Sequence, residues 1–122
     1  MPRRLLVVDD QKDIAEMLTE YLGEAGYRVR AVPDGSAMRA ALEGERFDAV
    51  ILDLTLPGGQ SGWTLADIVR SHGAVLVVMT GDHRHAAELE AKGWAHIMKP
   101  FRLAAMVGLL EQVLGGTAAA AD

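Results

Sequence analysis

The sequence predicts an α/β fold in which helices cover a doubly wound parallel sheet of five strands. Short apolar runs rich in β-branched residues alternate five times with longer segments whose apolar residues recur at helical spacing. Most of the runs are apolar almost without interruption, as expected of strands that are buried on both faces of a parallel sheet. A chain of 122 residues has room for one domain of this kind.

The five strands are expected, in chain order, at 4–8, 27–32, 47–52, 74–79 and 95–98. The first helix is expected at about 11–24, because its apolar residues form one stripe and Gly26 follows its end. The turn at 33–36 leads into a second helix that stops around Gly44, and a third helix around Leu65 and Val69 follows the loop at 57–62.

A weaker, polar helix is expected at about 84–92, and a last helix at 101–114. The last helix has an apolar stripe at helical spacing, made by Leu103, Met106, Val107, Leu110 and Leu114. We expect one domain over residues 1–116, with 117–122 as a short tail or the start of a linker. The sequence has no internal repeat.

Composition excludes several classes of function. The formal charge of −5 argues against binding to nucleic acid, which requires a positive field. No apolar stretch approaches the roughly 20 residues that a membrane span requires, so no membrane partner is expected. The absence of cysteine removes thiolate chemistry and disulfides, and it is consistent with the reducing cytoplasm.

Four of the apolar runs end on a reactive polar residue. The first run stops at Asp9 and Asp10, the third at Asp53, the fourth at Thr80 and the fifth at Lys99. Because the carboxyl ends of parallel strands share one edge, and open α/β sheets place their sites at that edge, these side chains are expected to converge.

Clustered carboxylates repel one another and require a cation, a raised pKa or separation. Two unit charges about 5 Å apart repel by roughly 3 kcal/mol at an effective dielectric of 20. Oxygen ligands favour Mg²⁺, and a carboxylate beside Mg²⁺ can attack phosphorus to give an aspartyl phosphate. Lys99 would supply a positive charge and Thr80 a hydroxyl donor, so the residues suit phosphoryl transfer to Asp53.

The sequence resembles the receiver domain of the two-component response-regulator family, over essentially the whole chain. The pieces that carry the resemblance are Asp9-Asp10, Asp53 with Pro57 four residues later, Thr80-Gly81, and Lys99-Pro100-Phe101. Receivers of this type are found free-standing or in hybrid histidine kinases. The resemblance implies a flavodoxin-like (βα)5 fold with strand order 2-1-3-4-5.

The resemblance also implies roles for individual residues. Asp10, Asp53 and the backbone carbonyl of Thr55 would bind Mg²⁺ directly, and Asp9 would reach it through water. Lys99 would contact the phosphoryl group, and its bond to Pro100 would be cis. The implied partners are a sensor histidine kinase or phosphotransfer protein, and a downstream protein or the rest of a hybrid kinase. Such a domain is a signalling module that catalyses only its own phosphorylation and dephosphorylation.

The sequence departs from the family pattern at His96, where most receivers have Tyr or Phe. Either the domain switches by another route, or His96 bonds to Thr80 or to a partner. The output surface is expected on the fourth helix, fifth strand and last helix, around His85, Glu88, Lys92, His96, Arg102 and Met106, close to Pro100. His83 and His85 form a His-x-His pair that is more typical of a solvated loop than of a metal site.

Other interpretations of these residues remain. Asp9 could simply cap the first helix, and Thr80 and Lys99 could be an ordinary turn residue and a solvated lysine. A phosphatase of the haloacid-dehalogenase type requires a second Asp where this chain has Thr55. No glycine-rich nucleotide-binding motif follows a strand. The main alternative is a receiver-fold docking module without a phosphorylation cycle, which His96 supports and the acidic residues oppose.

Overall fold

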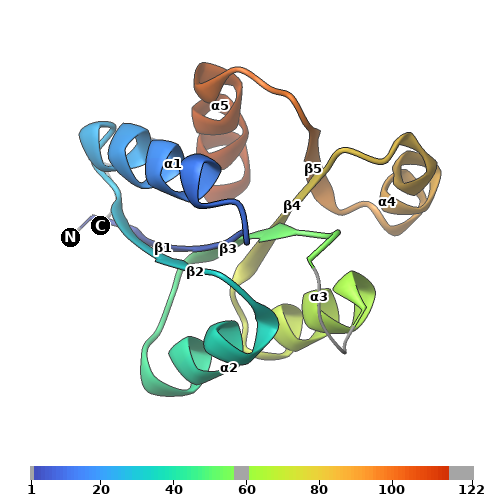
Figure 1. The fold of residues 1–122 in the computed structure, drawn as a ribbon. Coiled ribbons are helices and arrows are strands. Elements are labelled where there is room, and N and C mark those ends of the chain that lie inside the picture. Colours follow the sequence, from blue (N-terminus) through green and yellow to red (C-terminus); the bar gives the residue numbers. More distant parts are fainter. Residues whose placement is uncertain (1, 57–60, 116–122) are drawn as a thin grey trace.

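The chain folds into a five-stranded parallel sheet with strand order β2-β1-β3-β4-β5 (Figure 1). The computed structural model describes residues 2–56 and 61–115. The predicted fold class and strand order are both confirmed. The strands are β1 (Arg4–Val8), β2 (Arg28–Val32), β3 (Ala49–Asp53), β4 (Val75–Thr80) and β5 (Ala95–Met98).

Helices cover both faces of the sheet. They are α1 (Lys12–Glu24), α2 (Gly35–Gly44), α3 (Gly62–Ser71), α4 (Ala86–Lys92) and α5 (Leu103–Leu114), with a short 3-10 helix, η1 (His83–His85), before α4. Figure 1 shows α1 and α5 on one face and α2 and α3 on the other, with α4 beside the β5 edge. Among the described residues, no helix is long and apolar enough to cross a membrane.

The element boundaries differ from the predicted ones by small amounts, with physical reasons. The third strand begins at Ala49 rather than at residue 47, and just before it the Asp48 carboxylate, in place of a backbone carbonyl, accepts the bond from the backbone N–H of Arg4 at 2.7 Å. The last helix begins at Leu103, since Arg102 has extended backbone angles. The predicted polar helix at 84–92 divides into η1 and α4.

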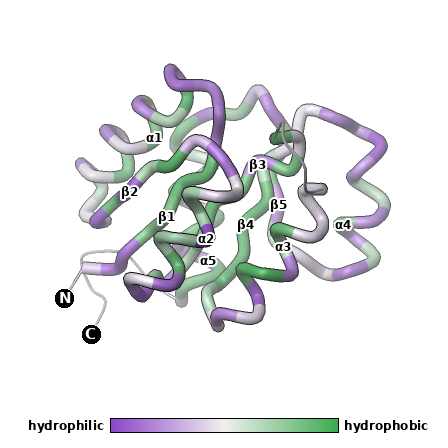
Figure 2. The backbone as a smooth tube through the Cα atoms, turned by 60° about the horizontal axis from the view of Figure 1, so that its bottom comes forward, coloured by the Kyte–Doolittle hydropathy of each residue, from purple (hydrophilic) through white to green (hydrophobic). Residues whose placement is uncertain are grey.

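The core consists of two apolar layers, one on each face of the sheet. Strand side chains alternate between them: Leu6, Val50 and Val78 face α2 and α3, whereas Leu5, Ile51 and Val77 face α1 and α5. Figure 2 shows apolar colour along β1, β3 and β4 and mixed polar and apolar colour on β2. All of β3 is buried, and the edge strands β2 and β5 are more exposed. The central strands therefore hold the carboxyl edge in fixed register.

Gly62 fixes the start of α3 against the end of β3. A Cβ atom at Gly62 would lie 2.1 Å from the carbonyl oxygen of Leu54, so no other residue fits without moving the backbone. Ser61 caps the helix by accepting a bond from the backbone N–H of Thr64, at 3.2 Å. This close contact places α3 directly below the segment that follows Asp53.

Candidate functional site

Three carboxylates meet at the carboxyl edge of β1 and β3. Val8 pairs with Leu52 in the parallel register, so Asp9 and Asp53 are the next residues of two neighbouring strands. One carboxylate oxygen from each of Asp9, Asp10 and Asp53 lies within 4.8 Å of the others. Asp9 and Asp53 are buried, and Asp10 is exposed at the mouth of the cluster. The predicted convergence of these carboxylates is confirmed.

The two carboxylate oxygens of Asp9 accept hydrogen bonds from different partners, one from the backbone and one from Lys99. Its Oδ1 accepts a bond from the backbone N–H of Gln11 at 2.9 Å, and its Oδ2 accepts one from Lys99 Nζ at 2.9 Å. Gln11, the residue at the cap position of α1, makes no side-chain cap of its own. Asp9 therefore supports the start of α1 and also belongs to the charged cluster, which a capping role alone does not explain.

Asp53 is 3% exposed and is oriented by the residue two positions later. Its Oδ1 accepts bonds from the Thr55 backbone N–H at 2.9 Å and from the Thr55 hydroxyl at 2.8 Å. Its Oδ2 lies 2.9 Å from Lys99 Nζ. One oxygen of Asp53 is thus held by two donors of Thr55, while the other faces the ammonium group.

Lys99 reaches back from the end of β5 into the carboxylate cluster. The Lys99–Pro100 peptide bond is cis, as the family resemblance implies, and the Lys99 backbone N–H donates to the Thr80 carbonyl at 2.8 Å. Burial lowers the pKa of Lys99, but the hydrogen bonds and charges of Asp53 and Asp9 together outweigh it, so the pKa is raised. Lys99 is therefore a partly buried ammonium and not a solvated strand-end lysine.

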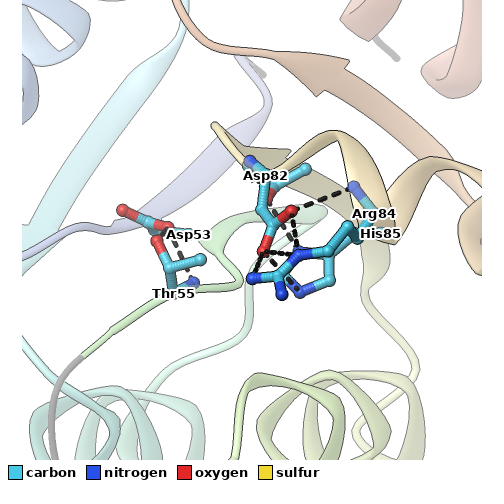
Figure 3. A network of polar contacts seen from close by, with 6 residues as sticks. Asp53, Thr55, Asp82, Arg84 and His85 are labelled. Carbon is cyan, nitrogen blue, oxygen red and sulfur yellow. Dashed lines mark hydrogen bonds and ion pairs between the residues drawn. The ribbon is translucent and has the colours of Figure 1, made fainter.

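Thr80 is fully buried beside the cluster, and its hydroxyl bonds to His85. Thr80 follows Met79, the register partner of Asp53, so the two side chains leave neighbouring strand ends. Thr80 Oγ1 lies 2.8 Å from His85 Nδ1 and accepts a bond from the Asp82 backbone N–H at 3.1 Å. Figure 3 shows Asp53 and Thr55 on one side and the group of Asp82, Arg84 and His85 on the other.

On the β5 side, the structure decides against one of the alternatives left open for His96 and corrects two expectations. His96 does not bond to Thr80; its Nδ1 lies 2.9 Å from the Trp94 carbonyl oxygen. His85 does not lie in a solvated loop, because its side chain is only 23% exposed and belongs to η1. Met106 is fully buried in the layer under α5, so its predicted place on the exposed output surface is wrong.

Asp82 is held by its own turn and does not point freely toward the acidic cluster. Its carboxylate accepts bonds from the Arg84 backbone N–H at 2.9 Å and from the Arg84 guanidinium at 2.7 Å. The side-chain hydrogen bonds from Arg84 hold the pKa of Asp82 well below its usual range. This arrangement fixes the start of η1 and, through it, the position of His85.

The cluster fits a hard divalent cation. Its donors are all carboxylate oxygens from two strand ends, and exposed Asp10 leaves a side open for the waters that Mg²⁺ retains. Lys99 offsets part of the negative charge, but three carboxylates still exceed one ammonium. The site can therefore hold a cation beside Asp53, and that carboxylate can act as a nucleophile.

Comparison with known proteins identifies the family to which a chain with this sequence is similar. The family model described as "Response regulator receiver domain" matches residues 5–111. The DNA-binding response regulator MtrA of Mycolicibacterium smegmatis is 36% identical over 106 residues, which cover 84% of this chain and 46% of the relative. The chain thus spans about half the length of that relative.

Solved structures show the same fold. A CheY-like receiver domain protein from Methanospirillum hungatei superposes with a TM-score of 0.84 at 24% identity, covering 94% of this chain and 95% of that chain. The response regulator TrrA of Thermotoga maritima, solved with Mg²⁺ and BeF, has a TM-score of 0.80 at 27% identity, covering 91% and 98%. The chain belongs to the response regulator receiver domain family.

Proposed function

We propose that this domain accepts a phosphoryl group on Asp53 from a histidine kinase or phosphotransfer protein, in a Mg²⁺-dependent reaction. One observation carries the proposal: the buried Asp53 carboxylate faces the Lys99 ammonium at 2.9 Å inside a cluster that can hold a divalent cation. The domain is a signalling module, and the only chemistry proposed for it is its own phosphorylation and dephosphorylation.

The hydrogen bonds of Asp53 support different tasks for its two oxygens. Oδ1 accepts bonds from two Thr55 donors, whereas Oδ2 accepts one, from Lys99, which is also the group that would contact the phosphoryl oxygens, so we assign the new O–P bond to Oδ2. The P–N bond of the donor breaks, and the departing nitrogen takes up a proton. Lys99 and the Thr80 hydroxyl then neutralise the phosphoryl oxygens. Bound Mg²⁺, held by Asp10, Asp53 and the Thr55 carbonyl with Asp9 reached through water, would offset negative charge on those oxygens.

An apolar groove next to Lys99 is suited to the phosphoryl donor. It has a volume of about 350 Å³ and lies between α1 and the start of α5, lined by Gln11, Ile14, Met17, Leu18, Lys99, Pro100, Phe101 and Leu103. Met17 is 52% exposed, the most accessible large apolar side chain in the described part of the chain. A helix of the kinase or phosphotransfer protein that docks here would bring its phosphohistidine to the mouth of the acidic cluster.

The test is phosphorylation by a small donor. Incubation with Mg²⁺ and phosphoramidate should add about 80 Da to the intact mass, as one phosphoryl group does. Asp53→Ala should abolish the gain. Asp82→Ala should retain it, because that carboxylate bonds to Arg84 in η1 and is not one of the three carboxylates of the cluster. A wild-type domain that gains no mass would contradict the proposal and favour the phosphorylation-independent docking module.

A separate experiment tests whether a protein donor docks in the apolar groove. Met17→Glu should slow phosphotransfer from a protein donor, since it places a charge in the groove, and should leave phosphorylation by phosphoramidate unchanged. Equal loss with both donors would place the effect in the acidic cluster and not in the groove.

A further inference from the structure

His85 connects the buried hydroxyl beside the acidic cluster to an aromatic group on the far side of η1. Its Nδ1 lies 2.8 Å from Thr80 Oγ1. Its ring meets the Trp63 ring edge to face, with centroids 5.6 Å apart and planes at 79°. Trp63 is the second residue of α3, whereas His85 precedes α4. One side chain therefore contacts both the site and a neighbouring helix.

The aromatic group extends from Trp63 to the segment before β5. The Trp63 and Trp94 rings have centroids 6.0 Å apart. Lys92 Nζ lies 4.9 Å from the Trp94 ring centroid and 5.7 Å from that of Trp63, and the Arg70 guanidinium lies 5.2 Å from the Trp94 centroid. Cations over aromatic faces hold such a group together. We call Trp63, Trp94, Lys92 and Arg70 the tryptophan cluster; it joins α3 to the end of α4.

One arrangement of protons satisfies all the polar contacts between Thr80, Asp82 and His85. Thr80 Oγ1 already accepts a bond from the Asp82 N–H at 3.1 Å, and its own single proton is left to donate. His85 Nε2 lies 3.9 Å from Asp82 Oδ2, and a proton on Nε2 is attracted to that carboxylate. Nδ1 is then the acceptor of the Thr80 proton. The ring proton lies on Nε2 in this arrangement.

A phosphoryl group on Asp53 would compete for that proton. Thr80 leaves the strand beside Asp53, and its hydroxyl can donate one hydrogen bond at a time. A phosphoryl oxygen is a charged and therefore stronger acceptor than a neutral imidazole nitrogen. When the hydroxyl turns to it, Nδ1 of His85 loses its donor in a half-buried position and the ring moves or takes its proton on Nδ1.

We propose that the Thr80 hydroxyl switches between His85 and the phosphoryl group on Asp53, and that His85 transmits this change to the tryptophan cluster. The inference rests on the proposed function. It moves the signal toward α3 and α4 through His85, by a route that does not require His96. Trp63 is the first residue outside the site to sense phosphorylation.

We call the proposed transmission from Thr80 through His85 to the tryptophan cluster the relay. Tryptophan fluorescence can test it, because the chain has two tryptophans. In Trp94→Phe the emission reports Trp63 alone. Addition of Mg²⁺ and phosphoramidate should change that emission in proportion to the phosphorylated fraction measured by intact mass. His85→Ala in the same background should keep the mass gain and lose the emission change. His83→Ala, two residues earlier in η1, is the matched control and should keep both.

Nitrogen NMR of the wild-type domain provides a second measurement that needs no substitution. The His85 ring should show its proton on Nε2 before phosphorylation and altered Nδ1 and Nε2 shifts afterwards, together with a shift of the Trp63 indole N–H. A mass gain without these changes, or an emission change that survives His85→Ala, would overturn the relay alone. Absence of any mass gain would overturn the proposed function, and the relay with it.

Discussion

The side chains in the two halves of the sheet's carboxyl edge are positioned by different kinds of structure. At β1 and β3, Asp9, Asp10 and Asp53 lie where the ends of two central, buried strands place them. At β4 and β5, Thr80 and Lys99 also lie at strand ends, but the groups around Thr80 come from η1 and α3. The first half is determined by strand register and charge, and the second by side-chain packing between helices.

This difference explains which half performs chemistry and which half can vary. The three carboxylates require close spacing, and the two central strands β1 and β3 fix it rigidly, whereas the Lys99 ammonium reaches them from the end of β5. β5 is a four-residue edge strand with only partly buried side chains, and η1 is a single turn. Elements with few buried contacts move at low free-energy cost. The β4–β5 half is therefore suited to reporting the state of the β1–β3 half.

The largest expected effect comes from removing the Lys99 ammonium, which joins the two halves of the edge. Lys99→Met leaves the buried Asp9 and Asp53 carboxylates without their shared ammonium, and breaking a buried ion pair in this way costs about 3 kcal/mol. Urea unfolding at pH 7 with EDTA should show the loss. Lys12→Met, in an exposed pair with Glu16, should change the free energy of unfolding by less than about 0.5 kcal/mol. Equal effects of the two substitutions would refute the role of Lys99.

A smaller effect is expected from the metal. Mg²⁺ at ten times its dissociation constant should stabilise the folded state by about 1.4 kcal/mol and raise Tm, because it binds the native cluster only. Asp10→Asn should remove that increment. Asp13→Asn, an exposed carboxylate in the first turn of α1, should retain it. A Mg²⁺ response in Asp10→Asn equal to that of the wild type would place the cation elsewhere.

The raised pKa of Lys99 predicts that the free energy of unfolding falls as the pH becomes alkaline. Because the folded-state pKa is raised, the contribution of Lys99 is complete below the ordinary lysine pKa of about 10.4 and is lost as pH rises through the folded value. Tyr27, whose pKa is raised by burial and by Glu111, acts in the same direction. In a Tyr27→Phe background, the free energy of unfolding measured with urea should therefore decline from about pH 8 to about pH 11.5. Adding Lys99→Met should flatten that decline.

Sequence alone predicted the residues of both halves whose positions depend on regular strands. Apolar runs ending in Asp9, Asp53, Thr80 and Lys99 are sufficient to place those residues together once the strands are parallel. Burial of Met106 could also have been predicted, because it lies in the apolar stripe of α5. The bond between Thr80 and His85 could not, since it depends on how η1 turns and on the position of Trp63 in a different helix.

The smallest effect is expected at the position where the sequence departs most clearly from its family. His96 bonds to the Trp94 carbonyl, and in the described part of the chain the Thr80 hydroxyl bonds to His85 and Asp82 and not to His96. If the relay runs through His85, then His96→Phe should leave the phosphorylation-dependent Trp63 emission change in Trp94→Phe nearly intact, whereas His85→Ala removes it. A loss of the emission change in His96→Phe, with the mass gain retained, would instead assign the relay to β5. That outcome would also remove the distinction between the two halves, because the signal would then depend on a strand residue of β5 and not on the packing of η1.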